Sequence, residues 1–411
     1  MDWADTAEQA GFRREVHEFI ETRLPAWYRA RRTLGEGHHV GPFSDDYGGD
    51  RASSEPVRRD AALEWARALA DRRWVAPHWP SEYGGGGMTT MEQFIFRQEM
   101  ARAGAPTVGG GGVQMLGPAM LVHGSEEQKR DYLPAILSGE TAWGQGFSEP
   151  GAGSDLAGLQ TRALRDGDEY VVNGQKIWTS GAHNADWIFA LVRTDPDAPK
   201  HRGISMLLFD IHSPGVSVRP LISAGWQHDL NETFFEDVRV PASQVLGEPN
   251  RGWYVAMTLL DFERSNIAGA EEVRAHLREL LDYTRSERGA RQTDERMRLA
   301  RAELTDRYIE SEVLFNFSFR IISMQSHGVV PNYESSVSKI FGATLEQTVA
   351  RSAMKVFGLY SNVWDRTDEH APLASSFTQL YVHSIPRTIM GGSNEIQRNV
   401  IATRGLGLPR G

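Results

Sequence analysis

The sequence contains no cysteine among its 411 residues. This absence excludes disulfide bonds, thiolate metal sites and a cysteine nucleophile, and it is typical of a protein in a reducing compartment. Any redox chemistry carried out by this chain therefore needs a bound cofactor.

Positive charge is also scarce. Lys and Arg together number 44, against 54 Asp and Glu, and the net charge is −10 with His neutral. A chain with this balance has no general attraction for a phosphate backbone. We therefore expect no nucleic-acid partner.

Long apolar runs are missing as well. The most weakly charged stretch, residues 103–124, contains four consecutive glycines and two prolines, a composition unsuited to a membrane helix. The acidic start, Met-Asp-Trp-Ala-Asp, lacks the basic and apolar regions of a signal peptide. We expect a cytoplasmic protein with no membrane segment.

Several catalytic motifs do not occur. The sequence has neither the Gly-x-x-x-x-Gly-Lys-Ser/Thr phosphate loop nor a strand followed by Gly-x-Gly-x-x-Gly. It has no Gly-x-Ser-x-Gly elbow, and its 13 histidines include no His-Glu-x-x-His. We predict no metal site and no serine hydrolase, and a nucleotide cofactor would have to bind in another way.

The first third of the chain has helical periodicity. Apolar residues recur at helical spacing over residues 12–139, as in residues 61–69 and 94–100. Residues 76–85 are rich in proline and glycine and predict a shaped loop between helices. Residues 34–56 are polar and aperiodic, which fits either a surface excursion or an insertion that lines a pocket.

The character of the sequence changes near Thr141. Two β-like runs, residues 170–172 and 176–179, flank Asn173-Gly174, a pair that favours the positive φ angles of a tight hairpin turn. Further β-like runs follow at residues 187–192, 203–209 and 234–240. The sequence therefore predicts a hairpin at Asn173-Gly174 and a middle β domain of about a hundred residues.

Helical periodicity returns after Gly252, and the predicted helices cover residues 259–283, 298–324, 337–356 and 376–385. The order helical, β, helical predicts an α+β fold with domains at residues 1–139, 140–250 and 251–411.

Three segments could carry chemistry, and each also has a purely structural interpretation. The glycine-rich residues 148–155 could let a planar or phosphorylated ligand approach the backbone, or they could form a solvated loop. Residues 178–180 combine an aromatic ring with two hydroxyls, which could wall a flavin or simply contribute a core tryptophan. In residues 259–264, Glu263 is either on a solvated helix face or, in an apolar cleft, a general base.

These segments belong to a series of motifs that resembles the acyl-CoA dehydrogenase family over nearly the whole chain. The motifs occur in the family's order: Ala-Pro-His-Trp-Pro-Ser-Glu-Tyr-Gly-Gly at 76–85, Gly-Ser-Glu-Glu-Gln-Lys at 124–129, Ser-Glu-Pro-Gly-Ala-Gly-Ser-Asp at 148–155, Asn-Gly-Gln-Lys-Ile-Trp-Thr-Ser at 173–180, Gly-Gly-Ser-Asn-Glu-Ile-Gln-Arg-Asn at 391–399 and Arg-Gly-Leu-Gly-Leu-Pro-Arg at 404–410. The resemblance implies a helical N-terminal domain, a middle β-barrel and a C-terminal four-helix bundle.

The resemblance also implies an FAD cofactor between the last two domains. By motif position, the flavin ring would be lined on its two sides by Gln145, Phe147 and Ser148 and by Trp178, Thr179 and Ser180. Ser393 and Glu395 match flavin-contacting positions, and Arg285 and Gly358 would reach the diphosphate from a neighbouring subunit. Two departures concern that diphosphate: residues 285–289 lack the family's phenylalanine, and residues 357–359 lack its second glycine.

The position of the base is a further departure from many family members. Those members carry the catalytic glutamate just before the C-terminal glycine motif, where this chain has Gly391. Residues 260–264, Leu-Asp-Phe-Glu-Arg, resemble the stretch that carries the base in isovaleryl- and long-chain-type enzymes, which implies Glu263 as the base. The backbone N–H of Gly391 then remains free to polarise a thioester carbonyl.

The implied reaction is α,β-dehydrogenation of an acyl-CoA to a trans-2-enoyl-CoA, with Ser154 and Asp261 for the pantetheine arm and Arg264 organising the site. Electrons would pass to an electron-transfer flavoprotein, and the enzyme would be a homotetramer or a heterotetramer. Two alternatives share the fold. One is a subunit of a mixed tetramer acting on steroid side chains, and the other is a flavin-dependent monooxygenase, against which the presence of Glu263 weighs.

Overall fold

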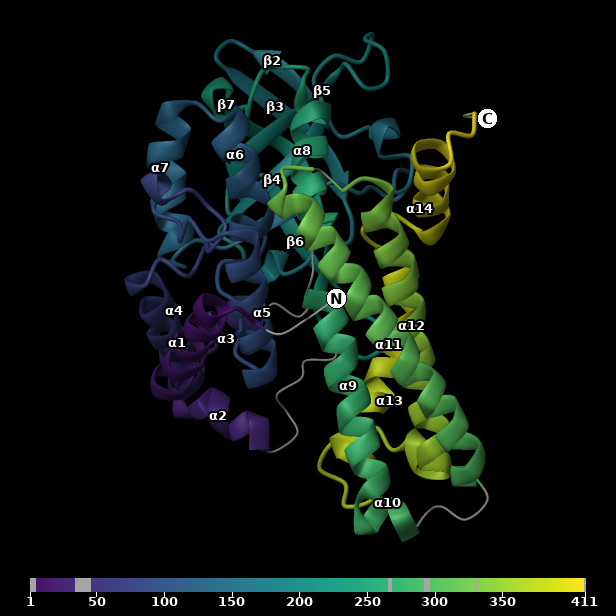
Figure 1. The fold of residues 1–411 in the computed structure, drawn as a ribbon. Coiled ribbons are helices and arrows are strands. Elements are labelled where there is room, and N and C mark those ends of the chain that lie inside the picture. Colours follow the sequence, from purple (N-terminus) through teal and green to yellow (C-terminus); the bar gives the residue numbers. More distant parts are fainter. Residues whose placement is uncertain (1–4, 34–45, 265–267, 292–295, 330, 410–411) are drawn as a thin grey trace. The chain divides into compact units, whose positions relative to one another are not determined.

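The computed structural model describes residues 5–33, 46–264, 268–291, 296–329 and 331–409 (Figure 1). Within these ranges the chain forms two compact units. The β unit comprises the described residues of Phe43–Gly87 and Pro106–Glu263, and the helical unit comprises those of Met1–Pro42, Met88–Ala105 and Arg264–Gly411. The domain boundaries at residues 139 and 250 stay a prediction.

A seven-stranded sheet organises the β unit (Figure 1). Six strands follow the order β1-β4-β2-β3-β7-β6, and β5 pairs with β4. β1 and β2 each lie parallel to β4, whereas the other pairs are antiparallel. The strands span Trp143–Gly146 (β1), Arg162–Asp166 (β2), Glu169–Lys176 (β3), Trp187–Arg193 (β4), Ile204–Asp210 (β5), Val216–Leu221 (β6) and Leu230–Pro241 (β7). The predicted α+β fold is confirmed.

The predicted strands at residues 187–192, 203–209 and 234–240 are confirmed as β4, β5 and β7. All residues of β4 except the two at its ends, and all residues of β5 except Asp210, are buried, in agreement with their apolar sequences. Ile188, Val192 and Leu207 belong to the core of the sheet and are fully inaccessible to solvent. β6 was not predicted, because its alternating exposed residues, including Arg219, leave a weak apolar pattern.

The hairpin predicted at Asn173-Gly174 is wrong. β3 runs straight through this pair, and the register with β7 shifts between Val172 and Gly174. The side chain of Asn173 donates to Asp237 Oδ1 over 2.9 Å and accepts from the Asp237 N–H over 3.0 Å. The tight turn instead lies between β2 and β3, where Gly167 has a φ of 64°. Asn-Gly therefore marks a β-bulge in this chain, because the tertiary partner β7 consumes its hydrogen bonds.

Gly174 offers a direct test of this bulge. Its φ is 152°, and a Cβ there would lie 2.6 Å from Thr161 Oγ1 and 2.7 Å from Thr161 Cα. We expect Gly174→Ala to lower the free energy of unfolding by about 1–3 kcal/mol, measured by urea denaturation. Gly151→Ala is the matched control, since no atom lies within 4 Å of its Cβ position. Equal stability of the two variants would contradict the packing argument.

The β unit also contains helices that precede or follow the strands in sequence. They span Asp46–Arg51 (α3), Pro56–Asp71 (α4), Gly117–His123 (α6), Glu126–Leu137 (α7) and Gly252–Arg264 (α8). α4 buries Ala62, Trp65 and Leu69 along one face, and the Trp65 indole donates to the Pro106 carbonyl over 2.8 Å. Burial of that apolar face, and not helix propensity alone, holds α4 in place.

The segment at residues 34–56 lies partly outside the described residues. Its last part forms α3, in which Tyr47 is 3% exposed and donates to the Gly139 carbonyl over 3.0 Å. Arg51 pairs with Asp186 over 2.9 Å. This end of the segment is therefore packed into the β unit, and a surface excursion does not describe it.

The helical unit contains α1 (Ala7–Arg23), α2 (Ala26–Thr33), α5 (Thr90–Ala103), α9 (Ala268–Arg285), α10 (Glu287–Arg291), α11 (Arg296–Ser326), α12 (Tyr333–Phe357), α13 (Ser376–His383) and α14 (Asn394–Val400). Its core packs Leu277 and Leu280 of α9 against Leu304 of α11 and Val349 of α12. The helices predicted at 298–324, 337–356 and 376–385 are confirmed as α11, α12 and α13. No helix of the described residues is long and apolar enough to cross a membrane.

Candidate functional site

The first predicted flavin-lining segment follows β1. Gly146 packs so closely on β4 that a Cβ would lie 2.9 Å from Ile188 Cδ1. Phe147 is buried with its ring 5.9 Å from that of Phe189, while Gln145 and Ser148 are half-buried. The side chains of Gln145 and Ser148 make no hydrogen bond to the described part of the chain. Their polar groups are therefore available to a ligand.

A buried ion pair holds this segment from behind. Lys176 Nζ lies 2.8 Å from Glu149 Oε1 and also donates to the Phe147 carbonyl over 3.1 Å. The other donors to Glu149 are the backbone N–H groups of Gln160 and Thr161, at 2.7 and 2.9 Å. Lys176 is completely buried, and Glu149 is 9% exposed.

The protonation of this pair follows from its surroundings. Burial opposes ionisation of Glu149, but the Lys176 ammonium and the surrounding donors lower the pKa of its carboxyl. Burial lowers the pKa of Lys176 to about 8, and Glu149 opposes that shift. Both groups are therefore charged at neutral pH, and the pair ties the start of the glycine-rich loop to the end of β3.

The second predicted flavin-lining segment follows β3 and touches the first. The Ile177 N–H donates to the Ser148 carbonyl over 2.9 Å, which brings residues 148 and 177 side by side. Trp178 has a φ of 63°, a left-handed conformation that is strained for a bulky residue, and the residue is 53% exposed. Ser180 is half-buried, and its hydroxyl makes no hydrogen bond within the described residues.

Thr179 points the other way. Its side chain is 0% exposed, and its hydroxyl lies 2.9 Å from Thr233 Oγ1 on β7. The Thr179 N–H donates to the Asn231 carbonyl, and the Thr179 carbonyl accepts from Asn231 Nδ2, each over 3.0 Å. Thr179 thus anchors the segment, and Trp178 and Ser180 are the members whose side chains remain available to a ligand.

The rest of the glycine-rich loop is exposed. Gly151 and Gly153 have no atom within 4 Å of their Cβ positions, and Ser154 is exposed. Asp155 pairs with Lys200 on the surface. The structure therefore leaves the Ser154 hydroxyl accessible, as a substrate contact requires.

The predicted base lies at the end of α8. The backbone of Glu263 belongs to the last turn of this helix, whereas the side chains of Asp261, Glu263 and Arg264 lie outside the described residues. Earlier in α8, Leu259 is fully buried, and Thr258 Oγ1 lies 2.9 Å from His123 Nε2. These contacts fix the helix on which Glu263 is carried.

In the helical unit, Gly391 begins a turn of two left-handed glycines, with φ angles of 61° at Gly391 and 83° at Gly392. Gln397 Nε2 donates to both of their carbonyls, at 3.1 and 3.3 Å. Gln397 is 2% exposed and accepts in turn from the Ser336 hydroxyl over 2.6 Å. Sequence reasoning missed Gln397 as the residue that holds this turn, although it lies inside the recognised motif.

The remaining predicted residues of the helical unit differ in their surroundings. Ser393 caps α14 by accepting from the Ile396 N–H, and Glu395 is exposed in the first turn. Arg285 ends α9 on the surface, 3.4 Å from Asp282, and Gly358 ends α12 with a φ of 59°. Glu395 and Arg285 are therefore exposed to ligands or neighbouring chains, whereas Ser393 and Gly358 are half-buried.

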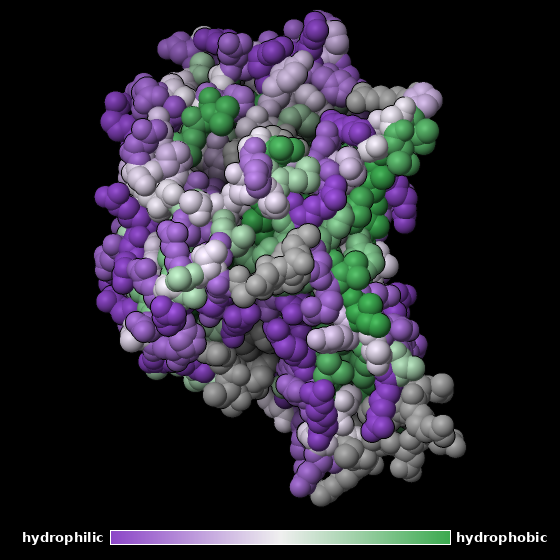
Figure 2. Space-filling model, viewed as in Figure 1, coloured by the Kyte–Doolittle hydropathy of each residue, from purple (hydrophilic) through white to green (hydrophobic). Residues whose placement is uncertain are grey.

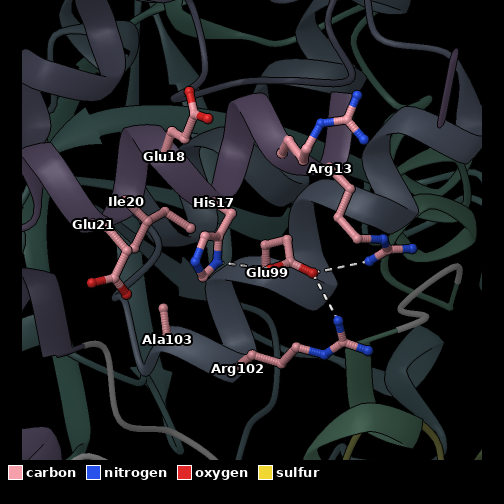
Figure 3. Close-up of a pocket in the computed structure, with 9 residues that line it drawn as sticks. Arg13, His17, Glu18, Ile20, Glu21, Glu99, Arg102 and Ala103 are labelled. Carbon is pink, nitrogen blue, oxygen red and sulfur yellow. Dashed lines mark hydrogen bonds and ion pairs between the residues drawn. The ribbon is translucent and has the colours of Figure 1, made fainter. Parts of the chain in front are cut away.

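A cavity of about 550 Å³ lies elsewhere in the helical unit, between α1 and α5 (Figure 3). Figure 3 shows Arg13, His17 and Arg102 directed at the carboxylate of Glu99, at 3.0, 3.5 and 2.8 Å. Of the predicted site residues whose side chains are described, none lines this cavity. Its charges neutralise one another, so we regard it as a structural ion-pair network.

Comparison with protein families matches three consecutive parts of the chain. The acyl-CoA dehydrogenase N-terminal domain matches residues 50–140, the middle domain residues 144–238 and the C-terminal domain residues 250–406. The chain belongs to the acyl-CoA dehydrogenase family. The resemblance noted from the motifs is therefore confirmed, and so are the enzyme class and the FAD cofactor that characterise this family of oxidoreductases.

Individual relatives agree with the family assignment. Acyl-CoA dehydrogenase IpdE1 of Mycobacterium tuberculosis is 37% identical over 382 residues, which cover 90% of this chain and 96% of the relative. Isovaleryl-CoA dehydrogenase of Pongo abelii is 30% identical over 286 residues, 68% of each chain.

Two similar solved structures cover the entire chain. The Tcur3481-Tcur3483 steroid ACAD superposes with a TM-score of 0.85, and the ChsE4-ChsE5 complex from Mycobacterium tuberculosis with a TM-score of 0.82. Each is 33% identical in sequence and covers 100% of both chains. Complexes of two different chains are thus among the similar structures.

Proposed function

We propose that this acyl-CoA dehydrogenase converts an acyl-CoA thioester into its trans-2-enoyl-CoA with FAD. The observation that carries the proposal is the surface formed where the segments after β1 and β3 meet. There a strained, exposed indole, Trp178, lies on the segment joined to Ser148, and Gln145, Ser148 and Ser180 keep their polar groups unpaired. A flat face beside unpaired donors and acceptors fits a planar ring with polar edges.

The residues of this chain divide between the parts of the cofactor. Gln145, Phe147 and Ser148 would line one side of the ring, and Trp178 and Ser180, anchored through Thr179, would line the other. Ser393 and Glu395 would contact the flavin, and Arg285 and Gly358 would reach the diphosphate of a neighbouring subunit's FAD. Bound FAD supplies the acceptor for the hydrogen that leaves the β-carbon as hydride.

The proton is removed by Glu263. Its carboxylate takes the α-proton of the thioester, while the Gly391 N–H donates to the thioester carbonyl and stabilises the charge that develops there. Gln397 supports this assignment, because it fixes the Gly391-Gly392 turn through both carbonyls and leaves the amide free. Ser154 and Asp261 hold the pantetheine arm, and Arg264 organises the site.

The chain acts within a tetramer, and a mixed tetramer with a second acyl-CoA dehydrogenase chain is the form we favour. Large exposed apolar side chains support an interface on the helical unit, with Leu359 84%, Leu406 70% and Ile389 66% exposed. Figure 2 shows apolar residues on the side of the view where α12 and α14 lie. The similar two-chain complexes and the altered motifs at residues 285–289 and 357–359 support a mixed assembly.

The similar steroid ACAD directs the choice of substrate. We infer that the acyl group is a steroid side chain and that reduced flavin passes its electrons to an electron-transfer flavoprotein. A bulky polycyclic acyl group and a straight chain demand different pocket shapes, so a panel of thioesters separates the two.

The test uses the protein purified alone and after co-expression with candidate partner chains. We expect a yellow protein whose flavin absorbance is bleached anaerobically by acyl-CoA, fastest with steroid side-chain thioesters. Straight-chain and branched acyl-CoAs are the comparison panel, and oxygen-dependent hydroxylation of the acyl group is assayed in parallel. Absence of bleaching by every thioester, or formation of a hydroxylated product, would rule out the proposed reaction.

A further inference from the structure

Two histidines and an asparagine form a compact group behind the Trp178 segment. The rings of His183 and His228 stack with their centroids 3.9 Å apart and their planes 23° apart. Asn231 lies at the start of β7 and is 0% exposed. Its Oδ1 is 2.8 Å from His228 Nε2, and its Nδ2 is 3.0 Å from His183 Nδ1 and 3.0 Å from the Thr179 carbonyl.

Hydrogen-bond accounting determines the protonation of this group. A primary amide has two N–H donors, and Asn231 directs one at the Thr179 carbonyl and the other at His183 Nδ1. His183 Nδ1 must therefore be an acceptor, so the ring is neutral with its proton on Nε2. The Asn231 carbonyl oxygen accepts the N–H of His228 Nε2. Every polar atom of the buried amide is thus satisfied in one arrangement only.

Protonation of His183 breaks that arrangement. An added proton on Nδ1 would face an N–H of Asn231, and turning the amide over to accept it would place Oδ1 against the Thr179 carbonyl. The Thr179 carbonyl would then lose its side-chain donor. This carbonyl directly follows Trp178, whose φ of 63° persists only while the surrounding contacts hold it. His183 is exposed, so protons from solvent reach it.

Other charges near His183 do not replace this effect. Residues Ala182–Asn184 pack against β1, β6 and β7. β1 carries no charged residue, Arg219 of β6 stacks on Phe234, and Glu232 of β7 accepts from Gln175. In the loop before β7, His228 is stacked on His183, and the Asp229 carbonyl accepts from the Gly181 N–H. Partial burial and, to a smaller extent, the charge of His228 lower the pKa of His183.

We propose that Asn231 and neutral His183, stacked on His228, are positioning residues that hold the Trp178–Ser180 wall in its ligand-binding conformation, and that protonation of His183 releases it. The proposal rests on the proposed function only in that the bound ring is FAD. The folded state disfavours protonated His183. The Trp178–Ser180 wall is therefore fully held at pH values above the ordinary histidine pKa of about 6.5, and it is released as the pH falls.

The decisive variant is His183→Gln, whose side-chain oxygen can still accept from Asn231 but cannot take up a proton near neutral pH. For the holoprotein, we expect the FAD dissociation constant to rise about tenfold between about pH 7.5 and about pH 5.5. The His183→Gln variant should bind FAD as the natural protein does at the higher pH and lose most of this pH dependence. His212→Gln removes an exposed histidine of the same unit, and this variant should keep the pH dependence of the natural protein.

A second readout does not depend on catalysis. The indole fluorescence of Trp178 is obtained as the difference between the protein and its Trp178→Phe variant. We expect this fluorescence to change over the same pH range as FAD binding, and to show no such change in the His183→Gln protein. A titration unchanged in His183→Gln, or no titration in the natural protein, would overturn the proposal. If the fluorescence titrates but no acyl-CoA reduces the flavin at any pH, the positioning role stands and the proposed reaction fails.

Discussion

Glu263→Gln is expected to keep its FAD and to reduce it with acyl-CoA about 10²–10⁴ times more slowly than the natural protein. The amide has nearly the shape of the carboxylate but cannot accept the α-proton. Rapid-mixing measurement of flavin bleaching under anaerobic conditions, at saturating acyl-CoA, gives the rate. The flavin content of the variant, read from its absorbance, shows whether the cofactor site is intact.

Glu248→Gln is the matched control, because Glu248 is an exposed glutamate close to the start of α8. We expect this control to reduce its flavin at the natural rate. Bleaching by Glu263→Gln at that same rate would transfer the role of base to another residue. Loss of flavin from Glu263→Gln would instead indicate a role of the side chain in holding the cofactor.

Lys176→Met should destabilise the protein by about 3–5 kcal/mol, because it leaves the Glu149 carboxylate buried without its counter-charge. The methionine fills most of the space of the lysine stem, so the effect reports the charge. The midpoint of urea unfolding, followed by circular dichroism, measures the change. At urea concentrations below this midpoint, where the variant is folded, it should also bind FAD more weakly, because it lacks the hydrogen bond from Lys176 to the Phe147 carbonyl.

The chain contains its own control for this prediction. Lys200 pairs with Asp155 on the surface, where the two side chains are 50% and 67% exposed. Lys200→Met should therefore cost less than about 1 kcal/mol. Pairing Lys176→Met with Glu149→Gln should recover part of the lost stability, because no unpaired charge is left buried. Equal losses in Lys176→Met and Lys200→Met would show that the buried pair does not stabilise the fold.

The success of the strand predictions depended on burial. β4 and β5 are apolar over their length and were recognised, whereas β6 alternates with exposed residues and was not. The strong local preference of Asn173-Gly174 predicts a hairpin turn. In the folded chain, two hydrogen bonds between Asn173 and Asp237, one donated by each residue, make the pair a bulge within β3, although the two residues are distant in sequence.

The candidate site also combines features that the motifs predict with features that only the folded chain determines. Motifs located Ser148 and Trp178 in two separate segments, but only the backbone bond from Ile177 to Ser148 places the segments together. The motif also predicts that residues 178–180 all face the flavin. In the folded chain, strand geometry and the contact with Thr233 turn the Thr179 side chain inward. The sequence alone does not indicate the roles of Asn231 and Gln397, because these roles consist of contacts with residues on other elements or in an adjoining turn.

Motif order and composition were enough to establish the family, its FAD cofactor and the lack of thiol chemistry, and they predict that the base lies on α8. These properties depend on which residues are present and on local spacing. Which side chains stay exposed beside Trp178, which lysine is buried with a glutamate and which histidines lie against Asn231 were decided by the folded chain. Burial and hydrogen-bond partners create these properties, and both come from residues far apart in sequence that meet only after folding.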